Sequence, residues 1–356
     1  MQRVVEKQTA EQFAMKIIKK SYLKKDEKMD LKSVLDILVD NEHKNVTNVI
    51  EYYQDKKFYY VVYEYNQGGL LFDYMAESQY FNDKTIACIV KQILSALMYN
   101  QAKEIFHKEL RPENLMIDDP LLDIPSVKIN DFSTSVEYMP KDKKGRKMRK
   151  TTFSCLYFMP PEVVGNWGYN ENSDIWSIGL IILLLVTGEW PIKGASNKAT
   201  LNNIKSNKIN IKQMIKEGKI SEELGTLLEK MLEFEPQSRI SAVDAINDPW
   251  VIKYSKNEDI EITANHPTKE KFKSFWNYYY LQYLWMQYFG VYSLDNIYID
   301  QIKEQAGAQG KKDSDTFTYE ELLEILTKVF DNTKDTIVFI INNSLREMNL
   351  DEGRVG

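Results

Sequence analysis

The sequence is poor in residues that define several classes of protein. Among 356 residues there are two cysteines, Cys88 and Cys155, too few for a disulfide framework and without the CxxC spacing of a zinc site. Glycine (15) and proline (10) are too scarce for a collagen-like or mainly low-complexity chain. Because low cysteine usage is typical of a reducing environment, we expect an intracellular, cytoplasmic protein.

Long apolar runs and an excess of positive charge are also missing. The longest apolar run, Leu180–Val186, is much shorter than the ~20 residues needed to span a bilayer, so we expect no membrane span. The 46 basic and 52 acidic residues leave a net charge of −6. Since proteins that neutralise nucleic-acid phosphates are usually basic, we expect no nucleic-acid partner.

The remaining composition, 43% hydrophobic and 28% charged, predicts a folded chain of about two domains. Aromatic and β-branched residues predict strands at Phe13–Ile18 and Phe58–Tyr65. Apolar residues spaced by three and four predict helices over most of 70–250. A polar stretch at 255–271 predicts a linker, and the aromatic-rich segment 272–292 predicts a helix.

Short motifs that carry chemistry occur in a fixed order. They are Ala14–Lys16 (AMK), His107–Asn114 (HKELRPEN), Asn130–Ser133 (NDFS), Pro160–Glu162 (PPE) and Asp174–Gly179 (DIWSIG). The series resembles the VAIK, HRDLKPEN, DFG, APE and DxWSxG motifs of protein kinases. Each motif alone is a weak signal, whereas the full order is specific.

This resemblance implies an α+β, bilobal protein kinase fold with a small β lobe, here truncated, and a large α-helical lobe. The kinase domain would cover 1–254. The implied activity is ATP-dependent phosphoryl transfer to serine or threonine of a protein substrate. The preference for serine or threonine rests on Arg111, which stands where the family has a lysine after HRDL.

The resemblance also assigns roles to single residues. Lys16 matches the lysine that holds the nucleotide phosphates and takes part in catalysis, and Asn114 and Asp131 match the two magnesium ligands. Glu109 stands at the catalytic aspartate, with Arg111 completing the predicted catalytic set. The implied cofactors are therefore ATP and Mg²⁺.

The adenine-binding segment is implied by a second match. Tyr63–Tyr65, followed by Gly68–Gly69, resembles the gatekeeper and hinge that lead into the next helix of a kinase. By this resemblance Glu64, Tyr65 and Met116 bind the nucleotide.

Departures from the family pattern predict impaired catalysis. Glu109 keeps a carboxylate but adds one methylene, and a misplacement of ~1 Å can cost about a hundredfold in rate. Counting back from His43 puts Val34 where the family has the glutamate that pairs with Lys16. Ser133 replaces the glycine of DFG and removes its conformational freedom.

The Gly-rich loop should precede Arg3, and the last motif stops at the C-terminus, so we expect a chain that is incomplete at both ends. Two functions stay open. The chain is either an impaired but real kinase that uses Glu109 as its base, or a pseudokinase that acts as a binding or scaffold protein.

The tail narrows the resemblance. Asp315–Leu322 resembles the second half of an EF-hand, although a plain helix pair fits as well. With Glu321 at loop position 12, the first position falls on Gly310 instead of a carboxylate, so we expect no calcium at Gly310–Glu321. A kinase domain, a linker and junction helix at 255–296, and an incomplete, degenerate EF-hand-like region at 297–356 resemble calcium-dependent protein kinases.

In that family the junction helix contacts the kinase domain or the tail, while a helix packed permanently on its own domain fits the aromatic residues of Phe272–Tyr292 equally well. The partner of the chain would be a protein substrate or a protein binding partner. Leu70 stands where related kinases have a glutamate that selects a basic residue upstream of the phosphorylated residue. Glu113 is retained and would perform part of that selection. The basic run Lys141–Lys150 is interpreted as a solvated loop.

Overall fold

The computed structural model describes residues 2–22, 25–77, 82–118, 124–131, 136–137, 156–165, 167–256, 324–325 and 328. It forms two units. The larger unit comprises Met1–Lys150, Tyr157–Ile192 and Ile204–Lys273, and contains the elements considered below, except that most of helix α6 (Asn197–Lys205) and Leu156 belong to the smaller unit. Several predictions fall outside the described residues, namely those on Ser133, Cys155, the loop Lys141–Lys150, the junction helix at 272–292 and the calcium loop Gly310–Glu321.

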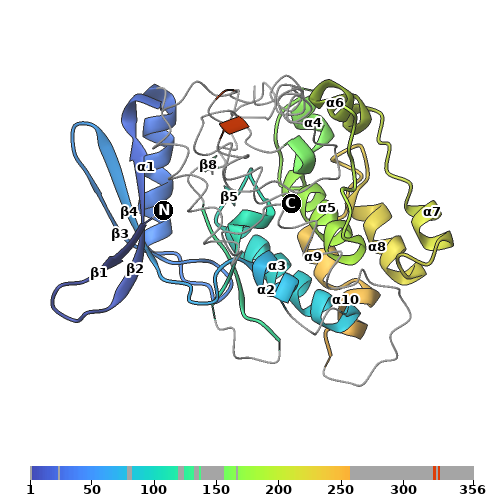
Figure 1. The fold of residues 1–356 in the computed structure, drawn as a ribbon, viewed down its shortest axis with the longest axis horizontal. Coiled ribbons are helices and arrows are strands. Elements are labelled where there is room, and N and C mark those ends of the chain that lie inside the picture. Colours follow the sequence, from blue (N-terminus) through green and yellow to red (C-terminus); the bar gives the residue numbers. More distant parts are fainter. Residues whose placement is uncertain are drawn as a thin grey trace. The chain divides into compact units, whose positions relative to one another are not determined.

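The N-terminal lobe of the larger unit is built on one antiparallel sheet, drawn in blue in Figure 1. Its strand order is β1-β2-β4-β3, and helix α1 (Lys25–Val39) packs against β3. The predicted strands at Phe13–Ile18 and Phe58–Tyr65 are confirmed as β2 and β4. The bounds are Gln2–Val5 for β1, Gln12–Lys19 for β2, Val49–Gln54 for β3 and Phe58–Glu64 for β4.

Alternating burial explains why β4 lies at the centre of this lobe. Tyr59, Val61 and Tyr63 are buried, as the period of two in a strand requires. In α1 the buried residues Leu31, Val34, Leu35 and Leu38 follow helical spacing and form one apolar face. Burial of each such side chain contributes roughly 1.5–3 kcal/mol, so the helix is fixed on the sheet mainly by this face.

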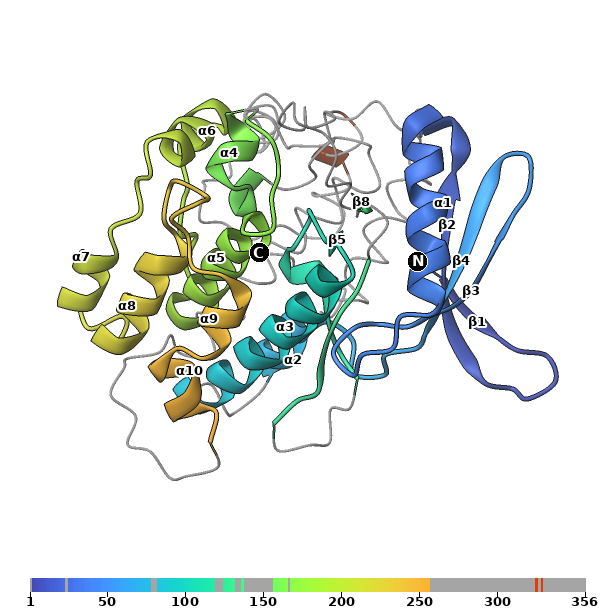
Figure 2. The same cartoon turned by 180° about the vertical axis from the view of Figure 1, so that it is seen from behind.

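The C-terminal lobe is helical, and Figure 2 shows its helices packed together. Helix α3 contacts α5, α9 and α10, and α8 contacts α5 and α10. The bounds are Leu71–Glu77 for α2, Asp83–Ala102 for α3, Pro161–Val164 for α4, Ser173–Thr187 for α5, Ile211–Lys216 for α7, Glu222–Met231 for α8, Ala242–Ile246 for α9 and Pro249–Tyr254 for α10. Helix α6 (Asn197–Lys205) lies mostly in the smaller unit.

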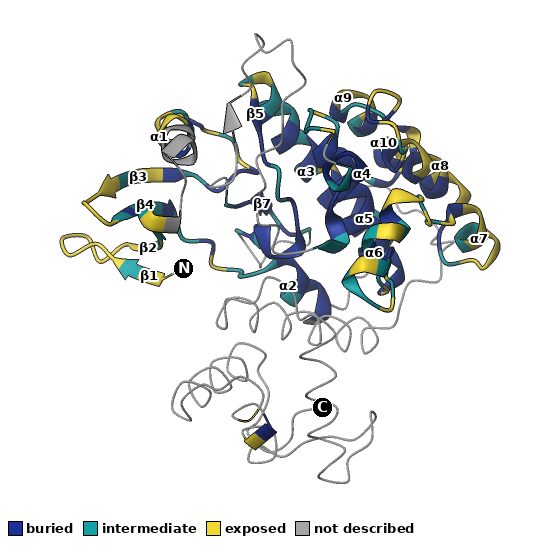
Figure 3. Ribbon diagram, turned by 90° about the horizontal axis from the view of Figure 1, so that it is seen from above, coloured by how far each residue is buried: buried dark blue, intermediate teal, exposed yellow. Residues whose placement is uncertain are grey.

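Helix α5 contains the apolar run Leu180–Val186 and is buried along its whole length, as the dark blue of Figure 3 shows. The run is therefore the core of the lobe. Among the described residues, no helix combines the length and apolar character that a membrane crossing requires.

Two short two-stranded antiparallel sheets between the lobes position the site. Strand β5 (Ile105–Phe106) pairs with β8 (Val136–Glu137), and β6 (Leu115–Ile117) pairs with β7 (Val127–Ile129). The HKELRPEN segment lies between β5 and β6 and ends in the 3₁₀ turn Pro112–Asn114. Two further 3₁₀ turns are Lys20–Tyr22 and Leu156–Phe158.

An antiparallel sheet followed by a helical lobe agrees with the predicted α+β organisation of the first part of the chain. The predicted all-α EF-hand-like tail lies outside the described residues, apart from 324–325 and 328.

Candidate active site

The loop after β5 is held by hydrogen bonds to Asp174, a residue of helix α5. The Asp174 carboxylate accepts hydrogen bonds from the backbone N–H groups of His107 (3.0 Å) and Lys108 (3.1 Å), and it also contacts the Tyr169 hydroxyl. Burial raises the pKa of the Asp174 carboxyl above its usual value. The fully buried His107 ring bonds the Asn130 carbonyl oxygen through Nε2 at 2.8 Å. These bonds fix the loop although Lys108 adopts a positive φ of 69°.

A cluster of charged residues occupies the loop itself. The Arg111 guanidinium donates from Nη1 to Glu109 Oε1 at 3.1 Å. It also forms a fork with Glu113, from Nε to Oε2 and from Nη2 to Oε1, each at 2.9 Å. The side chains of Arg111 and Glu113 are 4% and 3% exposed, and that of Glu109 is 20% exposed. Arg111 therefore binds both carboxylates of the predicted catalytic loop at once.

Lys16 and Asp131 meet across the lobes. The Lys16 ammonium lies 2.7 Å from Oδ1 and 2.6 Å from Oδ2 of Asp131. Asp131 follows β7 with φ at 65°, a left-handed conformation that is uncommon for aspartate. Val34, which the resemblance predicts to stand at the position of the family's glutamate, is fully buried in α1. Asp131 thus supplies a carboxylate to Lys16 where Val34 has none.

Asn114 is joined to the same assembly through the backbone. Its side-chain Nδ2 donates to the Glu109 carbonyl at 2.8 Å, and its own carbonyl accepts the Asn130 N–H at 2.8 Å. The second bond ties the loop to the residue immediately before Asp131. The structure therefore brings together Lys16, Glu109, Arg111, Asn114 and Asp131, the predicted catalytic and metal-binding residues.

The two predicted magnesium ligands fit the ion's chemistry. Among the described residues there is no group of three or more His, Cys, Asp or Glu side chains able to hold a metal by itself. Magnesium usually binds through one or two protein oxygens together with substrate phosphates, rather than in a cage of protein ligands. An Asp131 carboxylate with an Asn114 amide oxygen meets this requirement.

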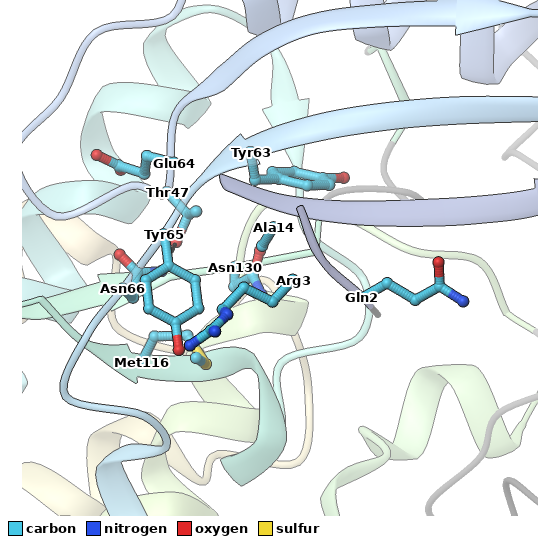
Figure 4. A pocket seen from close by; sticks show the side chains of 10 residues that line it. All are labelled: Gln2, Arg3, Ala14, Thr47, Tyr63, Glu64, Tyr65, Asn66, Met116 and Asn130. Atoms are coloured by element: carbon cyan, nitrogen blue, oxygen red, sulfur yellow. Dashed lines mark hydrogen bonds between the residues drawn. The ribbon is translucent and has the colours of Figure 1, made fainter. Parts of the chain in front are cut away.

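A cavity of about 160 Å³ lies next to Asn130, the residue before Asp131, and is lined on one side by residues of β1, β2 and β4. Figure 4 shows the side chains around it, among them Glu64, Tyr65 and Met116, three of the six residues predicted to bind the nucleotide or its metal ion. The other three, Lys16, Asn114 and Asp131, do not line this cavity. The lining also includes Ala14, Tyr63 and Asn130, which belong to the motifs described above, and four residues that sequence reasoning did not single out for the site, namely Gln2, Arg3, Thr47 and Asn66.

Glu64 lines the cavity, but its carboxylate is bound elsewhere. Oε2 lies 2.8 Å from the Lys128 ammonium, and Oε1 accepts the Asn48 N–H at 2.7 Å. The Lys128 side chain is buried and also lies 3.2 Å from the Asp118 carboxylate. A nucleotide contact at Glu64 would therefore have to come from its backbone.

Arg3 is one of the cavity-lining residues to which sequence reasoning gave no role. In the β1–β2 pairing Arg3 lies opposite Ala14, two residues before Lys16, so its side chain lies at the cavity. Figure 4 shows the guanidinium extending toward Tyr65 and Met116. The pairing register of the first two strands is the signal that could have found it.

Comparison with known proteins agrees with this geometry. A family model for the protein kinase domain matches residues 1–251, so the chain belongs to the protein kinase family. Members of this family transfer a phosphoryl group from ATP with the help of Mg²⁺.

The relatives include calcium-dependent protein kinases. The chain is 30% identical over 258 residues to calcium-dependent protein kinase 4 of Plasmodium berghei, covering 72% of the chain and 48% of that protein. It is 28% identical over 344 residues to calcium-dependent protein kinase 5 of Plasmodium falciparum, covering 96% and 58%. Myosin light chain kinase A of Dictyostelium discoideum is 31% identical over 255 residues, covering 72% and 84%. The chain spans about half the length of the calcium-dependent kinases it matches.

Proposed function

We propose that the chain is a protein serine/threonine kinase of the calcium-dependent type with weakened phosphoryl transfer. The observation that supports this is the convergence of Lys16, Asn114, Asp131 and Glu109 on one cleft, next to a cavity lined by the residues predicted to contact the nucleotide base, Glu64, Tyr65 and Met116.

Lys16 would hold the nucleotide phosphates, and Asn114 and Asp131 would hold Mg²⁺. The ion neutralises charge that develops on the phosphoryl oxygens. Glu109 would accept the proton of the substrate hydroxyl. The hydroxyl oxygen then bonds to the γ-phosphorus while the bond from that phosphorus to the departing ADP oxygen breaks.

Three features argue for slow transfer. Glu109 has one methylene more than aspartate, which moves its carboxylate relative to the loop backbone. The Arg111 guanidinium already binds Oε1 of Glu109, so a substrate hydroxyl must compete with it or use the other oxygen. Val34 also leaves Lys16 without the glutamate that holds it in related kinases, and Asp131 has to pair with Lys16 as well as with Mg²⁺.

The same features favour a second candidate, a pseudokinase that binds a protein partner without transferring phosphate. If the bond from Arg111 keeps both oxygens of Glu109 from reaching a substrate hydroxyl, Glu109 cannot act as the base, and the cleft would serve as a binding site only.

The test is transfer of labelled phosphate from ATP to a generic protein substrate, for the natural chain, Glu109→Asp and Lys16→Met. We expect weak transfer by the natural chain, a rise of about tenfold or more in Glu109→Asp, and none in Lys16→Met. A natural chain with an ordinary kinase rate of about 1–100 s⁻¹ would refute impairment. No transfer by the natural chain or by Glu109→Asp would favour the pseudokinase.

A further inference from the structure

Arg111 and Glu113 form a buried ion pair held by two hydrogen bonds. Two parallel N–H···O bonds of 2.9 Å join the guanidinium edge to both carboxylate oxygens. An arginine on one molecule recognises a carboxylate on another through the same bidentate geometry. Here both partners belong to the same loop and are almost completely buried.

The pair changes what the cleft can recognise. Glu113 is the residue that the family resemblance credits with attracting a basic residue of the substrate. Its two oxygens are bound by an arginine that is covalently tethered and two residues away. A peptide arginine would have to displace this guanidinium, and removing one partner of a buried ion pair is strongly unfavourable.

A second residue points in the same direction. Leu70 stands where the related kinases have the other acid that selects a basic residue, and it forms an isolated bridge with Met116. No carboxylate is therefore present at the Leu70 position to compensate for the neutralised Glu113.

We propose, on the basis of the function proposed above, that Arg111 takes the place of the substrate's basic residue. The cleft then accepts a serine- or threonine-containing peptide without requiring a basic residue upstream. Arg111 is in this sense a specificity-determining residue, because its guanidinium fills a subsite that would otherwise attract a cation.

The test measures peptide binding, not catalysis, with the full chain. Fluorescent peptides that share one serine carry an arginine at each upstream position in turn, and each is matched by a peptide with glutamine at that position. For the natural chain we expect each arginine and glutamine pair to bind equally, within about twofold. In Arg111→Gln, arginine at one position should improve binding by about tenfold or more, and Glu113→Gln in the same chain should abolish the gain.

Loss of Arg111 leaves two carboxylates close together, so folding is checked by circular dichroism and thermal melting. Arg111→Lys is the second variant, since its single ammonium cannot form the fork with Glu113, and it should show a smaller gain of the same kind. If Arg111→Gln does not fold, Arg111→Lys decides.

Two results would overturn the inference. One is a natural chain that prefers an arginine peptide about tenfold and loses this preference in Glu113→Gln. The other is the absence of any gain in the folded Arg111 variants, whether or not the natural chain binds a peptide measurably. Phosphate transfer is measured in parallel, so a failure of the proposed kinase activity is distinguished from a failure of this peptide preference.

Discussion

The Lys16 ammonium contacts both carboxylate oxygens of Asp131, at 2.6 and 2.7 Å. Both side chains are about a quarter exposed, so the pair lies at the cleft surface and can open when ligands arrive. A residue expected to bind phosphate and a residue expected to bind Mg²⁺ therefore neutralise each other. Nucleotide binding has to exchange this contact for two new ones.

Asp131→Asn should remove the magnesium dependence of nucleotide binding. In the natural chain we expect Mg²⁺ to raise the affinity for a fluorescent ATP analogue by about tenfold, because Asp131 gains a cation when Lys16 turns to the phosphates. The variant should respond by less than about twofold. Asp118→Asn, which makes the same charge change at a residue that pairs with Lys128, serves as the control. A full magnesium response in Asp131→Asn would exclude Asp131 as a ligand.

Arg3→Val should strengthen nucleotide binding. The Arg3 side chain extends over the cavity toward Tyr65 and Met116, so a base has to displace it, whereas valine is shorter and apolar. We expect an increase in affinity of about fivefold, or ~1 kcal/mol, by fluorescence titration. Lys19→Val makes the same charge change at an exposed position of β2 that does not line the cavity. Weaker binding in Arg3→Val would mean that the guanidinium stabilises the bound base.

Arg239→Met should destabilise the helical lobe severely. The Arg239 guanidinium forks onto both oxygens of Glu162, at 2.9 and 3.0 Å, and both side chains are at most 2% exposed. Loss of the arginine leaves a buried charge unpaired, which should lower the free energy of unfolding in urea by about 3–5 kcal/mol. Lys253→Met breaks an exposed pair with Glu223, and we expect no measurable change. Equal effects in the two variants would contradict the distinction between buried and exposed pairs.

Stability should fall on acidification through His43. Burial, and next the nearby charge of Lys44, lower the pKa of the His43 imidazole below 6.5. The ring contacts Ser95 Oγ, accepts the Asn45 N–H and stacks near Tyr99, all of which suit its neutral form. The unfolded chain binds the proton more tightly, so this contribution is complete above about pH 6.5 and is lost as pH falls through the lowered pKa.

The measurement for His43 is urea unfolding between about pH 5 and 8, the range in which histidine titrates. His43→Gln should show a smaller loss of stability than the natural chain over the acid half of this range. Parallel curves for the two proteins would assign the dependence to other groups.

Motif order could predict which residues meet, because each motif is a local pattern with a fixed place in the fold. Lys16 on β2 and Asp131 after β7 are 115 positions apart, yet both were identified, and the structure joins them. The strands β2 and β4 were also predictable, since their aromatic and β-branched residues are typical of a half-buried sheet.

Orientation within a motif could not be predicted in the same way. Glu109, Arg111 and Glu113 alternate along the sequence, and nothing in that spacing says that the arginine turns to both acids. The direction in which Arg111 points depends on how the loop packs against α5. Arg3 was missed for a related reason, since its place at the cavity follows from the register of β1 on β2.

The contact between Glu64 and Lys128 has a consequence for motion. Glu64 ends β4 and pairs with Asn48 through the backbone, whereas Lys128 belongs to β7 of the other lobe. The ion pair therefore links the two lobes at the place where they would rotate relative to one another. If the lobes open and close, rotation that separates Glu64 from Lys128 must break a largely buried bond. The turn between β1 and β2 is exposed, and Arg3 lies on β1 just before it. This turn can move with much less resistance.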